Sequence, residues 1–355
     1  LLIWSMLLWL GWTMINIPYY AWGAEISENY DERTRITGWR QVFAYAGNVT
    51  VLALPAMANE LTGFGGLPKE GLTIIGSLAL VALPSTVAIC LLFIPERNNY
   101  GSSTASLSTN FKAVWKNGSF KLVWIAFMLK YMGAAWGSAL FMLFAVHVVG
   151  EKENVAAILL GHYFLQLLTL PMWVKLSERI GKKETYIIGG ILFTLVIPLF
   201  LLIGNGDTWL LVFVLACVGA SGSYFTAISM SMKADVIEIA SHRAGENVAG
   251  AYIAIWSLGQ KMIGAIALGI CLPLLQYLGF DPQGGNGPRE LQILSIMYVV
   301  PQAIMYVGAV GFIWRYPINA ERLERIRSAF VRKEERKANE KKHHINKTRK
   351  KHKQK

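Results

Sequence analysis

Lys261 lies near the middle of a long apolar stretch, "AYIAIWSLGQKMIGAIALGICL", which covers residues 251–272. It is ten or more residues from either end of its apolar block, too deep for its ammonium group to reach water easily. Ser257 lies one helical turn earlier on the same face, and Trp256 and Gln260 flank that face. An indole beside a lysine and an amide suits a hydroxylated ring, which packs on the indole while its hydroxyls form charge-assisted hydrogen bonds. An internal ion pair with a structural role is the alternative.

A second polar group lies in "TMINIPYYAWGAE", near the start of the sequence. Thr13, Asn16 and Tyr20 share one face of a helix, and Pro18 frees a backbone carbonyl beside them. The group could line a polar pathway or make a polar contact between helices.

Charged residues also stand where apolar blocks end. Arg40 begins one block and, taken alone, fits an anchor that extends to lipid headgroups. Asp235 and Glu238 lie three residues apart at the end of another block, with basic partners such as Arg33 and Arg35 in a different loop. Such pairs can hold one side of a moving protein closed, although a solvated carboxylate pair is the simpler interpretation.

Three further polar residues have mainly structural interpretations. Lys130, in "FMLKYMGAAWG", favours an interfacial lysine that marks the end of an apolar stretch. His147 and His162 stand alone in apolar surroundings, which favours packed, neutral imidazoles.

The elements that must position these residues are membrane-spanning helices. The chain has 355 residues, of which 54% are hydrophobic and only 16% charged, and its apolar residues gather in blocks of about 20, the length that crosses a bilayer. The blocks predict nine spans, at residues 1–23, 40–58, 72–95, 122–149, 154–175, 184–203, 208–231, 248–276 and 291–315.

The basic residues predict how the chain crosses the membrane. They concentrate in alternate loops, including "SENYDERTRITGWR", "KLSERIGKKET" and "KADVIEIASHRAGEN", which are therefore expected in the cytoplasm. The Ser/Asn-rich segment 96–121 is the predicted central cytoplasmic linker between a three-span unit, residues 1–95, and a six-span unit, residues 122–315. Leu1 then lies on the outer side, which favours a chain whose preceding spans, an odd number, are absent from the sequence; a nine-span protein is the alternative.

Residues 316–355 form a basic cytoplasmic tail. They hold 15 Lys and Arg against 5 Glu, a net charge of +10 out of +12 for the chain. We expect the tail to contact anionic lipids of the plasma or inner membrane. Because the positive charge belongs to a tail, it does not indicate a nucleic-acid-binding domain. The spans contain no H-E-x-x-H motif, nucleophile elbow or metal-spaced cluster, which argues against a membrane-embedded enzyme.

Two long stretches resemble the glycoside–pentoside–hexuronide:cation symporter family, the melibiose-carrier branch of the major facilitator superfamily. They are "INIPYYAWGAEISENYDERTRITGWRQVFAYAG" and "SMKADVIEIASHRAGENVAGAYIAIWSLGQKMIGAIALG". The resemblance implies an all-α membrane bundle in which nine of twelve spans are present, so that three N-terminal spans are missing. It also implies that the main cation-binding acids of the family, on its second span, are missing.

The resemblance also implies roles for the polar residues named above. Asn16, Tyr20, Arg40 and Lys261 align with substrate-binding positions, and the sequence context adds Trp256. Thr13 aligns with a cation ligand, and Asp235 and Glu238 align with a cytoplasmic acidic pair expected to form a gate with Arg33. Two departures stand out: Asn16 replaces a carboxylate, and Asn247 stands where relatives often carry a basic residue.

The expected function is symport of a sugar or glycoside with Na⁺ or H⁺ by alternating access, with no cofactor besides the coupling ion. A carrier of the same fold for an anionic sugar or a lysophospholipid is the alternative, because Arg40 and Lys261 without an acid at position 16 suit an anion.

Overall fold

The computed structural model describes residues 7, 10–12, 14–15, 19, 39–40, 42–51, 53, 68–94, 114–152, 154–244 and 248–317. All regular elements within these ranges are helical, as predicted. They are a short apolar helix, Val42–Val51, and the longer α3 (Pro68–Phe93), α5 (Gly118–Leu143), α6 (Val155–Ile180), α7 (Lys182–Val196), α8 (Thr208–Ala244), α9 (Ala249–Tyr277) and α10 (Pro288–Trp314). A π-helical segment, η1 (Phe144–Val149), continues α5, and a 3₁₀ segment, η2 (Ile197–Leu202), continues α7.

Seven of the described helices are long and apolar enough to cross a membrane. They coincide with the last seven predicted spans, within a few residues at most ends. Of the other two predicted spans, 1–23 lies largely outside the described residues and 40–58 is described only in part, by the short helix Val42–Val51 and a few residues beside it, so the count of nine stays a prediction. The predicted domain boundaries at 95, 121 and 315 also stay predictions.

The predicted end of one span at residue 231 is wrong, because α8 continues to Ala244. The segment expected to be a polar loop instead buries Met232, Val236 and Ile239 at helical spacing. Its charged residues Lys233 and Asp235 contact other residues of the bundle, as described below. The helix can therefore continue past them.

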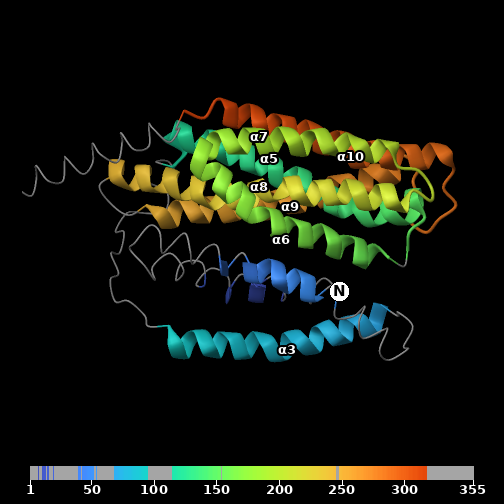
Figure 1. Ribbon diagram of the computed structural model, residues 1–355, viewed down its shortest axis with the longest axis horizontal. Helices are drawn as coiled ribbons and strands as arrows, with labels where there is room; N and C mark the ends of the chain where they lie inside the picture. The colour runs from blue at the N-terminus through green and yellow to red at the C-terminus, as the bar shows by residue number, and fades with distance from the viewer. Residues whose placement is uncertain are drawn as a thin grey trace, which may run out of the picture.

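Helices α5 to α10 lie side by side in one bundle, called here the second bundle (Figure 1). Helix Val42–Val51 lies between this bundle and α3. Exposed apolar side chains cover α3, including Leu80, Leu92 and Phe93. Such a surface suits contact with lipid chains, as expected for a spanning helix.

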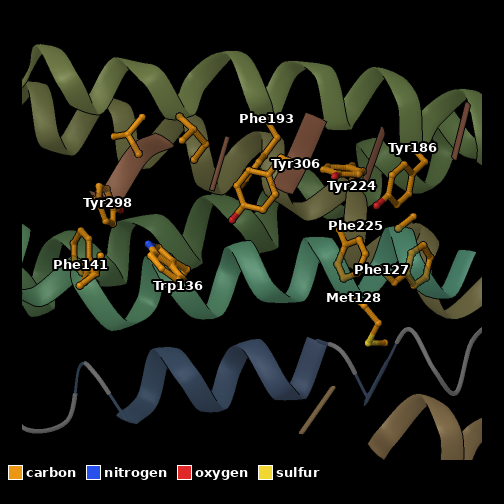
Figure 2. Packing of buried hydrophobic residues seen from close by; sticks show 14 of the residues in the cluster. Phe127, Met128, Trp136, Phe141, Tyr186, Phe193, Tyr224, Phe225, Tyr298 and Tyr306 are labelled. Carbon is orange, nitrogen blue, oxygen red and sulfur yellow. The ribbon is translucent and has the colours of Figure 1, made fainter. Parts of the chain in front are cut away.

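Aromatic rings fill the interior of the second bundle (Figure 2). Phe127 stacks on Tyr186 with their planes 3° apart, and Tyr186 meets Tyr224 edge-on at 5.2 Å. Nearer the other end, Phe144 stacks on Tyr298 at 4.9 Å. The interior of this bundle is therefore a packed core.

Glycines set how closely the helices of this bundle approach. In "GAAWG", Gly133 and Gly137 face Tyr306 and Gln302 of α10 so closely that an added Cβ would overlap either side chain. Gly219 of α8 lies against the backbone of His162 on α6, where a Cβ would be 2.5 Å from the His162 carbonyl oxygen. Small residues of this kind let membrane helices pack backbone to backbone. His162 itself packs as predicted, with its Nδ1 3.0 Å from the Leu215 carbonyl oxygen.

Gly219→Ala should therefore destabilise the bundle by about 1–3 kcal/mol, because α6 can relieve the overlap only by moving its backbone. Gly161→Ala is the matched control, since Gly161 lies inside α6 and a Cβ added there would have no atom within 4 Å. The thermal denaturation midpoint of the purified protein in detergent should fall for Gly219→Ala and hold for Gly161→Ala. Equal midpoints would show that the two helices are not in close contact at Gly219.

Candidate functional site

One hydrogen bond joins the second bundle to the segment that precedes α3. The Tyr45 hydroxyl, on helix Val42–Val51, lies 2.7 Å from Oγ1 of Thr226 on α8. Tyr45 is buried although its neighbours on the same helix are mostly exposed. Thr226 therefore marks the face of α8 that is turned toward the first, N-terminal group of predicted spans.

Arg40 lies just before the same helix. Its guanidinium carbon is 4.5 Å from the ring centroid of Tyr19, a cation–π contact. Tyr19 belongs to the first predicted span, so this contact joins the start of the second predicted span to the first. Thr13, Asn16, Tyr20 and Arg33 lie outside the described residues, and their roles stay predictions.

Lys261 is exposed on α9, about 18 Å along the axis from the start of the helix and about 24 Å from its end. Its depth near the middle of a span is therefore as the sequence indicated. A lysine there does not belong on a lipid-facing surface, because the charge would be poorly solvated. The position suits a face that meets protein or water.

Trp256 lies elsewhere on α9 and is only 4% exposed. Its ring meets Phe127 edge-on at 5.1 Å and Phe120 at 5.9 Å, both on α5. The structure therefore separates the buried Trp256 from the exposed Lys261, although their spacing in the sequence predicted a shared site. Ser257 and Gln260, which are half-buried, lie between these extremes. A substrate contact for Trp256 stays a prediction.

Lys233 is a candidate site residue that was not predicted from the sequence. It lies on α8 beyond the predicted end of that span, and its Nζ is 4.5 Å from the ring centroid of Trp256 and 5.9 Å from that of Tyr131. The signal that could have found it is the helical spacing of Met232, Val236 and Ile239, which continues past the lysine.

Lys130 is not the interfacial lysine that the sequence predicted. It is 6% exposed in the interior of the second bundle, with its Nζ 3.4 Å from the ring centroid of Phe193 and 4.2 Å from that of Tyr306. The negative faces of these rings partly replace water around the ammonium group, so it need not extend to the surface. Figure 2 shows Phe193 and Tyr306 close to each other in the interior of the bundle.

The acidic pair falls at one end of the bundle. Oδ2 of Asp235, which is buried, accepts a hydrogen bond from Nζ of Lys182 at 2.5 Å, while Glu238 is half-buried. Lys182 belongs to "KLSERIGKK" and begins α7, so this ion pair lies within the second bundle. Burial, and next the charge of Asp235, raise the pKa of the nearby Tyr316 hydroxyl far above its usual value. Contact of the acidic pair with Arg33 across the bundles stays a prediction.

Within the described ranges, no group of three His, Cys, Asp or Glu side chains could hold a metal ion. Seven spans, a packed bundle and polar groups on the face turned toward its neighbour define a multi-pass helical membrane protein.

Residues 1–320 match the family described as MFS/sugar transport protein, and the chain belongs to this family. Among its relatives is the inner membrane symporter YicJ of Escherichia coli, 23% identical over 323 residues that cover 87% of this chain and 67% of the relative. The sodium-dependent lysophosphatidylcholine symporter 1 of Gallus gallus is 23% identical over 349 residues, covering 87% and 65% of the two chains. The glucuronide carrier protein homolog of Escherichia coli is 21% identical over 324 residues, covering 89% and 69%. The chain thus spans about two thirds of the length of these relatives, and the family is one of transporters rather than enzymes.

Proposed function

We propose that the protein is a secondary active transporter that couples the movement of Na⁺ or H⁺ to symport of a sugar or glycoside. The observation that carries the proposal is the exposed Lys261 in the middle of a spanning helix, where a charged side chain needs a polar partner. The names of the relatives described above support the class of function, since they include an inner membrane symporter and a sodium-dependent lysophosphatidylcholine symporter.

Alternating access fits the packing of the second bundle. Its aromatic interior leaves the face near Thr226 as the surface along which a solute would pass, and the two bundles would rock about that surface. Coupling follows if cation and solute favour the same closed arrangement, because each then raises the affinity of the other. The protein would lie in the plasma or inner membrane with its basic tail in the cytoplasm, against anionic lipids.

Uptake into proteoliposomes tests the proposal, using the protein that carries these 355 residues. An imposed Na⁺ or H⁺ gradient should drive accumulation of a labelled sugar, an ionophore should abolish it, and the sugar should be recovered unmodified. Sugar uptake that does not depend on either the Na⁺ or the H⁺ gradient would indicate uniport. Recovery of a chemically altered sugar would indicate an enzyme. Either result would overturn symport.

Transport of an anionic substrate, an anionic sugar or a lysophospholipid, is the second candidate. Lys233 favours it, because this lysine adds a positive charge beside the same face of the second bundle.

A further inference from the structure

Lys233 lies on the face of α8 that meets the first group of spans. It is seven residues after Thr226, which returns it to the same side of the helix about 10 Å further along the axis. Met230, between them on that side, is an exposed apolar residue. Since Thr226 bonds Tyr45 across the two groups of spans, Lys233 faces the surface along which the proposed route runs.

The neighbours that the described part of the structure gives to the ammonium group of Lys233 are aromatic rings. It lies over the Trp256 ring at 4.5 Å and near the Tyr131 ring at 5.9 Å, and within the described part of the chain it forms no ion pair with a carboxylate. Cation–π contacts stabilise a cation less than a hydrogen-bonded anion does. An oxyanion that reached the Lys233 ammonium group would therefore bind it more strongly than the aromatic rings do.

Trp256 adds a second potential donor, its indole N–H group. Its Nε1 is buried and, among the residues that the structure describes, has no hydrogen-bond partner. Buried indole N–H groups usually find an acceptor, because leaving one unsatisfied costs free energy. Lys233 and Trp256 thus place a positive charge and an unsatisfied N–H group at one place, on different helices.

We infer that Lys233, Trp256 and Tyr131 form an oxyanion-binding subsite on the transport route, for the carboxylate of a sugar acid or the phosphate of a lysophospholipid. The inference rests on the proposed function and names the chemical class of its substrate. The ammonium group moves off the indole to the oxyanion, while the aromatic rings of Trp256 and Tyr131 contact the apolar part of the same molecule.

Binding to the purified protein tests this with three probes: glucuronate, lysophosphatidylcholine and the neutral sugar glucose. Lys233→Met keeps the size of the side chain and removes its charge. It should weaken binding of the anionic or phosphate-bearing probe about 10- to 150-fold, the range for one charge-assisted hydrogen bond, and leave any binding of glucose unchanged. Lys233→Arg should retain part of the affinity, because it retains the charge. Which of the two charged probes responds tells a sugar acid from a lipid phosphate.

Lys130→Met is the matched control, because Lys130 also has aromatic contacts but, unlike the half-buried Lys233, is buried in the interior of the bundle. It should bind every probe as the parent does, and size-exclusion profiles establish that both variants are folded. A parent that binds glucose alone, or equal binding of a charged probe by parent and Lys233→Met, overturns the subsite and leaves the proposed transport intact. A parent that binds none of the three overturns both proposals.

Discussion

Replacing Lys130 with glutamate should prevent the second bundle from folding stably, whereas Lys130→Met should leave it folded. The ammonium group points at the faces of Phe193 and Tyr306, with Tyr224 and Phe225 each 6.0 Å away. These faces are electronegative, so a carboxylate there would be repelled by the same rings that stabilise the lysine. An uncompensated buried charge costs roughly 3–5 kcal/mol, a large part of the stability of most proteins. Methionine fills the same space and makes favourable sulfur–aromatic contacts.

The yield of monodisperse protein in detergent and its thermal denaturation midpoint would measure this effect. Lys121→Glu is the control, because it makes the same charge change on an exposed residue of α5. We expect Lys121→Glu to behave as the parent and Lys130→Glu to aggregate or melt far earlier. If the two glutamate variants melted together, Lys130 would not be enclosed by aromatic rings in the folded protein.

Lys261→Ala should weaken substrate binding about 10- to 150-fold, because it removes one charge-assisted hydrogen bond worth about 1.5–3 kcal/mol. The prediction rests on the exposure of Lys261 at the middle of α9, where its charge requires water, substrate or another protein group. Lys261→Arg should restore affinity poorly, since a planar guanidinium does not replace a compact ammonium group in a fitted site.

Substrate binding to folded protein is the measurement for Lys261, after expression has been checked. Met262→Ala is the control, because Met262 is the next residue on α9 and is also exposed. It should bind substrate as the parent does. If Lys261→Ala did so too, the lysine would be structural, and the substrate site would have to be rebuilt around Tyr20 and Arg40.

The spans were predictable because an apolar block of bilayer length can be recognised from its own sequence, without knowing which helices it packs against. The end of α8 was not, since Lys233 and Asp235 remain in a helix only because Trp256 and Lys182 lie beside them. Lys130 was misplaced for the same reason: its aromatic contacts come from α7 and α10, far away along the chain. Spacing along one helix also could not show that α5 covers Trp256 while Lys261 stays exposed.

The interlocked aromatic rings of the second bundle also determine which parts of the protein can deform. Edge-on and stacked contacts among Phe127, Tyr186 and Tyr224 resist sliding of one helix past another, so in the proposed alternating-access cycle we expect α5 to α10 to move as a single stiff body. The barrier between the two proposed orientations of that body would then depend on the bonds it makes with its neighbour, such as the one between Tyr45 and Thr226. The transport rate should accordingly respond to small changes on that surface and tolerate conservative substitutions in the interior. Residues on the surface would then control the transport rate, and residues in the interior would control how long the protein stays folded.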